Sequence, residues 1–184
     1  MQNDDKAASR RQYLTFLLAS EEYAVDVLSV KEIIEYGDVT RVPGTPVHVR
    51  GVINLRGSVV PVVDLAVKLG REKSPLSRRS CIVIVESTFA KATADKTEQG
   101  ERVVTGVVAD AVNQVIEFSP DDIEPPPAFG TGVRLHYLDG IAKTGAAFVL
   151  VLNMDSVLSD EARSAATLAH PSDVEAPASV EIPV

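Results

Sequence analysis

The chain has 184 residues, 45% of them hydrophobic, which is enough for one large domain or two small ones around a sizeable core. Aromatic residues are scarce (5%) and tryptophan is absent, so the core must come mainly from valine, isoleucine and leucine, and β-branched side chains favour strands. The net charge of −8 argues against nucleic-acid binding and suits an anionic membrane surface poorly, while the single cysteine, Cys81, excludes an internal disulfide and favours a reducing cytoplasm.

The first half of the chain predicts short strands separated by turns. Residues 1–11 are polar, lack the apolar core of a signal peptide and are expected to be flexible. Alternation of apolar and polar residues, or a short apolar run, predicts strands over residues 13–18, 23–27, 49–55 and 59–63. The segment 28–36 fits either a strand or a helix, and a loop with two prolines follows at 42–46.

A short helix is predicted where the first half ends. Asp64 can cap a helix over residues 65–69, and Gly70 can adopt the left-handed conformation that ends it. Residues 71–80 are expected to form a linker to the second half. The longest apolar run, at 146–152, has the length of a strand and falls well short of the ~18 residues of a transmembrane helix.

In the second half, strands are predicted over residues 81–85 and 102–109. Between them, residues 86–100 are polar and too many for a tight hairpin, so we expect an exposed insertion. Residues 160–169 are expected to form a C-terminal helix, because the proline that follows disfavours a longer one. The segment after it is acidic and contains three prolines, which is typical of disorder. The predicted organisation is a flexible segment over 1–11, a folded domain over 12–165 and a flexible acidic tail over 166–184.

The two halves of the chain are similar to each other. The counterparts are Val25, Val30, Ile33 and Ile34 with Val107, Val112, Val115 and Ile116, Pro43 with Pro127, Gly51 with Gly140, and Asp64-Leu65 with Asn153-Met154. Chance similarity between valine-rich strands is the alternative, but glycines, a proline and helix caps recur in order as well. Each half has about five short strands, which bury their edges best by curling into a small barrel. We therefore expect two barrels, over about 12–70 and 81–158, with a groove between them.

Catalytic and metal-binding motifs are missing from the sequence. The three histidines, His48, His136 and His170, lie far apart and form no metal-binding motif. The glycines of the 51–57 segment are not followed by the Lys-Ser/Thr of a phosphate-binding loop, and no pair of carboxylates stands out as an acid/base couple. We expect a protein that binds other proteins, without catalytic residues, metal or cofactor.

The most unusual stretch of the sequence is Gly51-Val-Ile-Asn-Leu-Arg-Gly57-Ser-Val-Val-Pro-Val-Val-Asp-Leu65. Strand alternation places Ile53 and Leu55 on one face of the strand. It places Val52, Asn54 and Arg56 on the other face. One interpretation is an ordinary hairpin with its polar face in water. The other is a strip that contacts a partner protein and uses Arg56 as an anchor, because arginine is enriched at interfaces.

This stretch resembles the family of the bacterial chemotaxis coupling protein CheW. The other matching motifs are Tyr23-Ala-Val-Asp-Val27, Val30-Lys-Glu-Ile33, Thr40-Arg-Val-Pro43, Gly106-Val-Val-Ala-Asp-Ala-Val112 and Tyr137-Leu-Asp-Gly-Ile141. The resemblance covers roughly residues 12–165, and the run from Gly51 to Leu65 is highly specific. It implies a mainly β fold of two tandem five-stranded SH3-like barrels, with short helical turns and a C-terminal helix.

The resemblance also implies a function without enzymatic activity. Proteins of this family link transmembrane chemoreceptors to the histidine kinase CheA, binding the cytoplasmic tip of the receptor and the regulatory domain of the kinase. The chain is then expected in the cytoplasm, at receptor arrays on the inner face of the cell membrane, with no nucleic-acid partner and no direct membrane insertion. Two alternatives stay open: a CheW-like scaffold of another chemosensory pathway, and a ligand-binding β-barrel or small hydrolase.

Seven residues are expected to bind partners: Val30, Glu32, Gly51, Val52, Asn54, Arg56 and Val115. The family motif carries a signalling role onto Val30, Glu32 and Arg56, and Gly51 lies in the same matching run. Val115 is the repeat counterpart of Ile33 and is expected to line the groove between the barrels, where an apolar helical-hairpin tip would fit. Glu32 and Arg56 are predicted to pair across the first barrel. As an exposed ion pair they would stabilise the fold by only ~0–1 kcal/mol, so a role in binding is expected instead.

Overall fold

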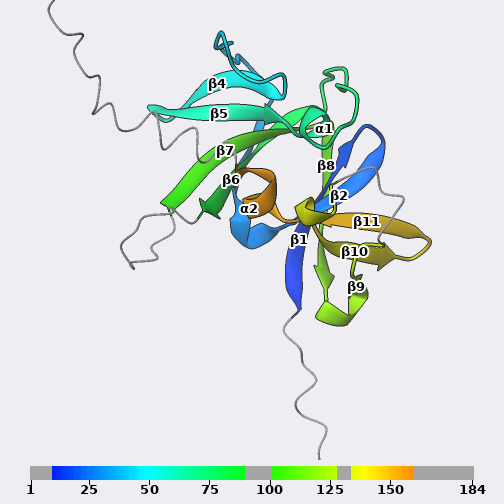
Figure 1. The fold of residues 1–184 in the computed structure, drawn as a ribbon. Coiled ribbons are helices and arrows are strands. Elements are labelled where there is room, and N and C mark those ends of the chain that lie inside the picture. Colours follow the sequence, from blue (N-terminus) through cyan, green and yellow to red (C-terminus); the bar gives the residue numbers. More distant parts are fainter. Residues whose placement is uncertain (1–9, 90–100, 128–133, 160–184) are drawn as a thin grey trace, which may run out of the picture.

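The computed structural model describes residues 10–89, 101–127 and 134–159, which fold into two β-sheets with a few short helices (Figure 1). The six-stranded sheet contains β1 (Arg11–Leu18), β2 (Glu21–Asp26), β8 (Ala111–Phe118), β9 (Ile123–Glu124), β10 (Leu138–Thr144) and β11 (Ala147–Leu152). The five-stranded sheet contains β3 (Val30–Glu35), β4 (Val49–Leu55), β5 (Ser58–Asp64), β6 (Cys81–Phe89) and β7 (Glu101–Ala109). The predicted mainly β fold is confirmed.

Short helical turns connect these strands. They are η1 (Val27–Ser29), α1 (Leu65–Lys68), η2 (Pro120–Asp122), η3 (Leu135–Tyr137) and α2 (Met154–Val157). The helix predicted over 65–69 is present as α1: the side chain of Asp64 accepts a hydrogen bond from Val67 N, and Gly70 follows with φ +79°. The segment 28–36, which fitted strand or helix, contains both, since η1 leads directly into β3.

The order of the strands follows the sequence repeat. The sheets run β8-β1-β2-β11-β10-β9 and β3-β6-β7-β5-β4. In the repeat, β3 corresponds to β8, β6 to β1, β7 to β2, β5 to β11 and β4 to β10. The second sheet therefore has the same strand order as the first, except that the first has the additional strand β9. The two caps also correspond, because Asn153 accepts a hydrogen bond at the start of α2 as Asp64 does in α1. The repeat therefore describes two equivalent sheets.

The sheets are not the two halves of the chain, and here the prediction of barrels over 12–70 and 81–158 is wrong. Strands β1 and β2 join a sheet otherwise built from the second half, and β6 and β7 join one otherwise built from the first half. The physical reason is a pair of parallel contacts between the halves, β5 with β7 and β2 with β11. Each half thus gives its first two strands to the sheet of the other.

The predicted insertion over 86–100 is too long at its start. Strand β6 continues to Phe89, which is opposite Glu101 of β7, so residues 86–89 are strand. Residues 90–100 lie outside the described part of the chain. The helix predicted over 160–169 and the flexible tail predicted over 166–184 also lie outside it, as do residues 1–9 of the flexible segment predicted over 1–11.

A shared hydrophobic core joins the two sheets. The six-stranded sheet contributes Leu14, Phe16 and Tyr23 to it, and the five-stranded sheet contributes Val83 and Val107. Helix α2, which lies between the two sheets in Figure 1, packs its buried residues into the same cluster. Each sheet has a smaller apolar cluster of its own. The two barrels are consequently one folded unit.

Candidate functional site

Six of the seven predicted partner-binding residues lie on the five-stranded sheet: Val30 and Glu32 on β3, Gly51, Val52 and Asn54 on β4, and Arg56 in the β4–β5 turn. Strands β3 and β4 are at opposite ends of the strand order. Nevertheless, Nη2 of Arg56 lies 3.0 Å from Oε2 of Glu32. The sheet therefore curls until its two edges are bridged, and the predicted pairing of Glu32 with Arg56 is confirmed.

The β4–β5 hairpin has two different faces, as strand alternation predicted. Ile53 is buried, and Leu55 packs with it into the apolar cluster of this sheet. Asn54 and Arg56 are exposed on the other face. We call Glu32, Val52, Asn54 and Arg56 the hairpin surface.

The turn at the end of this hairpin has an unusual backbone. Leu55 is opposite Ser58, so Arg56 and Gly57 form a two-residue turn, and their φ angles are +51° and +90°. A turn with two positive φ angles favours Asn-Gly, because side chains other than those of glycine, asparagine and aspartate are strained there. Oδ1 of Asn54 accepts a hydrogen bond of 2.7 Å from Gly57 N and supports the turn. The Arg56 side chain is 81% exposed, so its position gains little from packing.

Gly51 has a structural reason to be glycine. A Cβ atom at this position would lie 2.1 Å from the carbonyl oxygen of Thr40, and φ is +143°. Thr40 approaches so closely because its backbone forms two hydrogen bonds with Val52, of 2.8 and 2.9 Å. The repeat counterpart, Gly140, meets the same constraint: its Cβ would lie 2.7 Å from the carbonyl oxygen of Glu124 in β9. Gly51 thus allows the backbone around Thr40 to pair with β4.

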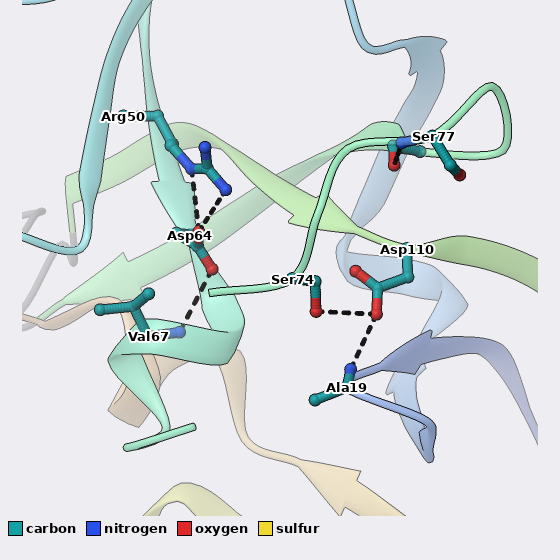
Figure 2. Close-up of polar contacts among 8 residues, drawn as sticks. Ala19, Arg50, Asp64, Val67, Ser74, Ser77 and Asp110 are labelled. Atoms are coloured by element: carbon teal, nitrogen blue, oxygen red, sulfur yellow. Dashed lines mark hydrogen bonds and ion pairs between the residues drawn. The ribbon is translucent and has the colours of Figure 1, made fainter. Parts of the chain in front are cut away.

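A buried ion pair joins β4 to the end of β5, next to the start of α1 (Figure 2). Nη2 and Nε of Arg50 lie 2.6 and 2.8 Å from Oδ2 of Asp64, and the two side chains are 11% and 4% exposed. The other carboxylate oxygen of Asp64 accepts the hydrogen bond from Val67 N that caps α1. The sequence revealed the cap but not Arg50, whose position just before Gly51 gave no sign of a partner fourteen residues away.

A second polar cluster holds the linker between the halves. Oδ2 of Asp110 accepts hydrogen bonds from Ala19 N (2.7 Å) and the Ser74 hydroxyl (2.9 Å), as Figure 2 shows. Nearby, the Tyr23 hydroxyl donates to Glu21, which also pairs with Arg71 of the linker. Burial raises the pKa of Tyr23 to about 12.

No group of side chains in the described ranges 10–89, 101–127 and 134–159 could hold a metal ion. Within the same ranges, none of the helices has the length and apolar character needed to cross a membrane. A family model, the CheW-like domain, matches residues 12–162 of the chain.

The chain belongs to the CheW-like domain family.

Individual CheW relatives match over most of their length. The chain is 32% identical over 151 residues to the chemotaxis protein CheW of Klebsiella aerogenes, covering 82% of this chain and 83% of the relative. It is 29% identical over 156 residues to the chemotaxis protein CheW of Rhizobium meliloti, covering 85% and 92%. The crystal structure of the scaffolding protein TtCheW from Thermoanaerobacter tengcongensis matches with a TM-score of 0.69 and 30% identity, over 86% of this chain and 94% of that one. The CheW fold of two SH3-like barrels and a role as a chemotaxis adaptor or scaffold are thereby supported.

Two of the residues predicted to bind partners are partly or wholly inside the fold. Val30 is half-buried and packs against the core that the two sheets share. Gly51 is buried beside Thr40. Val115 lies elsewhere, on β8 of the six-stranded sheet, where it is 52% exposed and sits opposite Leu14. The structure thus gathers four residues at the hairpin surface and leaves Val115 on the other sheet.

The junction of the two sheets carries an open pocket that was not predicted from the sequence. Its volume is about 380 Å³, and it is lined by Asp26, Leu28, Ser29, Glu86, Thr88, Arg102, Asp139, Leu152, Asn153, Met154 and Asp155. Four of these side chains are acidic and none is valine or isoleucine, so this pocket is not the apolar groove that the sequence predicted, and Val115 does not line it. The residues come from both sheets and from α2, and no local motif could have united them.

Proposed function

We propose that the chain is a non-enzymatic adaptor that couples transmembrane chemoreceptors to the histidine kinase CheA. In this proposal the hairpin surface binds the regulatory domain of the kinase or the cytoplasmic tip of a receptor, and the protein works in the cytoplasm at receptor arrays on the inner face of the cell membrane. Membership of the CheW-like family and the similarity to proteins named for chemotaxis support it.

The observation that carries the proposal is the conformation of Arg56. A left-handed arginine costs roughly 1–2 kcal/mol of backbone strain. Its exposed ion pair with Glu32 returns about 0–1 kcal/mol. Folding alone would therefore favour asparagine or glycine here. An arginine that is nevertheless present, with its guanidinium 81% exposed, is better explained by a contact with another protein.

Glu32 is proposed to orient that guanidinium. The ion pair spans the two edges of the curled sheet and fixes the long Arg56 side chain over β3. A side chain that is already ordered loses less conformational entropy when a partner binds it. Asn54 contributes indirectly, because its hydrogen bond to Gly57 N supports the turn that presents Arg56.

The remaining predicted residues are proposed to act in different ways. Val30 and Gly51 support the surface from within, through core packing and the close approach of Thr40. Val115 is proposed to belong to a separate contact on the six-stranded sheet. Its repeat counterpart Ile33 is 44% exposed on β3, so each sheet presents an apolar side chain at the equivalent place.

Kinase activation in a reconstituted mixture tests the proposal. Receptor-containing membranes, CheA and the purified chain are combined, and the rate of kinase autophosphorylation is measured together with co-sedimentation of the chain. The Arg56→Asn variant is expected to bind the membranes or the kinase at least ten times more weakly, because hot-spot arginines contribute about 2 kcal/mol or more.

The matched control is Arg79→Asn, which removes an exposed arginine from a turn of the linker, outside the hairpin surface. This control should couple receptor and kinase as well as the unchanged chain. Normal binding and normal kinase activation by Arg56→Asn would contradict the assignment of the hairpin surface. Failure of the unchanged chain to bind either partner would contradict the coupling function itself.

A further inference from the structure

A second open pocket lies at the start of β4. Its volume is about 260 Å³, and it is lined by Arg41, Val42, Thr45, Pro46, Val47, Val49, Arg50 and Lys73. These residues come from the proline loop before β4, from the start of β4 and from the linker after α1. Three of them are basic and none is acidic, although the chain as a whole has a net charge of −8.

Two of the three cations are available to a ligand. Arg50 is turned into the protein and is neutralised by Asp64, as Figure 2 shows. Arg41 and Lys73 are exposed, and neither forms an ion pair with another residue in the described part of the chain. The pocket therefore presents two positive charges that the folded domain leaves without a counter-charge.

The rim of the pocket is apolar. Val47 is 87% exposed and Val42 is 39% exposed, and Pro46 lies between them in the loop. A pocket that combines exposed valines with two free cations is complementary to a segment that combines aliphatic side chains with carboxylates.

The chain contains such a segment. Residues 171–184, PSDVEAPASVEIPV, carry Asp173, Glu175 and Glu181, and they contain no lysine or arginine. The same segment contains three valines and an isoleucine: Val174 and Val180 lie between acidic residues, and Ile182 and Val184 follow Glu181. We propose that residues 171–184 dock intramolecularly in this pocket, with their carboxylates at Arg41 and Lys73 and their aliphatic side chains against Val47.

The connection is long enough for this docking. Ser159 is the last described residue, and Asp173 follows fourteen residues later. An extended chain spans about 3.3–3.6 Å per residue, so the connection reaches at most roughly 45–50 Å, and roughly 30 Å if residues 160–169 form the predicted helix. Both lengths exceed the radius of gyration of a compact domain of about 150 residues, roughly 15 Å, so the segment can leave the face of the domain on which the connection begins. A tether of this kind also gives the segment a local concentration on the order of millimolar, so weak contacts suffice.

A nitroxide spin label on the full chain tests the proposal. The label is attached to a cysteine introduced as Ser179→Cys, and the amide signals of the domain are recorded by NMR. Cys81 is buried and burial raises the pKa of its thiol, so the introduced cysteine is the one that reacts. The expected result is a selective loss of the amide signals of Thr45, Val47 and Lys73. Signals of the β10–β11 turn, such as that of Gly145, serve as the reference and should persist.

Charge substitutions separate docking from random contact. In R41E/K73E the selective loss should disappear, and exchange of the opposing charges in D173K/E175K should restore it. The control R10E/R134E makes the same change in net charge outside the pocket and should keep the loss. Salt should weaken the effect, because the screening length falls from about 8 Å at 0.15 M to about 3 Å at 1 M.

Three outcomes would overturn the proposal. The first is a loss of signal spread evenly over the domain. The second is a selective loss that R41E/K73E leaves unchanged. The third is a selective loss in a mixture of two chains, one isotope-enriched without a spin label and the other spin-labelled without isotope enrichment. The segment of one copy would then occupy the pocket of a second copy.

Discussion

Three residues other than glycine have positive φ angles in the described part of the chain: Ala19, Ser20 and Arg56. Ala19 and Ser20 form the β1–β2 turn, and Ala19 N donates a hydrogen bond to Asp110 that offsets part of the strain. Arg56 itself has an exposed ion pair with Glu32, and its turn is supported by the hydrogen bond from Gly57 N to Asn54. Backbone strain tends to concentrate at functional positions, and Arg56 is the largest of the three side chains that carry it.

The first prediction concerns the stability of Arg56→Asn. Asparagine tolerates the left-handed conformation, so the gain in backbone free energy should offset the lost ion pair. We expect the free energy of unfolding, measured in urea, to stay within about 1 kcal/mol of the unchanged chain or to rise. A fall of several kcal/mol would mean that Arg56 serves the fold, and weakened binding by this variant would then carry no weight.

The second prediction concerns Gly51→Ala. The new methyl group would overlap the carbonyl oxygen of Thr40, so the variant should lose at least about 1–3 kcal/mol of unfolding free energy. The matched control is Gly57→Ala, where φ is also positive but no atom lies within 4 Å of the added Cβ. That control should lose only about 1 kcal/mol through backbone strain. Equal losses in both would show that Thr40 moves away easily.

At the scale of single elements, the sequence predicted the structure well wherever the signal was local. The cap of α1 by Asp64 and the two faces of the β4–β5 hairpin follow from neighbouring residues, and both are observed. The end of β6 was missed because Glu86, Ser87 and Thr88 are polar, and the strand structure of this stretch depends on pairing with β7. The ion pair of Arg50 with Asp64 could not be predicted either, because it depends on the register in which β4 pairs with β5.

The third prediction tests that ion pair. Asp64→Asn keeps a side-chain oxygen for the α1 cap, as Asn153 provides for α2, but removes the charge opposite the buried Arg50. Leaving one buried charge unpaired costs about 3–5 kcal/mol, which thermal or urea unfolding would detect. The control is Asp26→Asn, which also caps a helical turn but pairs with an exposed arginine. Its loss should be about 0–1 kcal/mol, and a similar loss in Asp64→Asn would contradict the role assigned to burial.

At the scale of the whole molecule, the repeat was visible in the sequence but the exchange of strands was not. Two barrels closed within their own halves and two barrels that exchange their first two strands bury the same side chains and use the same turns. Alternation and caps are therefore identical for both arrangements. The difference lies in the parallel pairs of β5 with β7 and of β2 with β11, which join residues far apart in the chain. For the same reason the acidic pocket at the junction of the sheets was not predicted.

Strand exchange makes the two sheets depend on each other. Phe16 of β1 is fully buried in the core that both sheets share, so Phe16→Ala should cost about 3–5 kcal/mol. Because neither sheet can close without strands from the other half, this loss should appear in both. Amide hydrogen exchange under native conditions is the measurement, and protection in β6 and β7 should fall by the same factor as protection in β1 and β2.

The control for this last prediction is Val59→Ala, on a side chain that is 74% exposed. It should leave protection in both sheets within a factor of about three, as expected for a surface change of ±0.5 kcal/mol. Independent sheets would give a different result: Phe16→Ala would lower protection in the six-stranded sheet and spare β6 and β7. The expected single cooperative unit would also hold the hairpin surface and Val115, which lie on different sheets, in a fixed relation to each other. The proposed coupling of two partner proteins would require such a relation, so a loss of cooperativity in Phe16→Ala should be accompanied by weaker coupling.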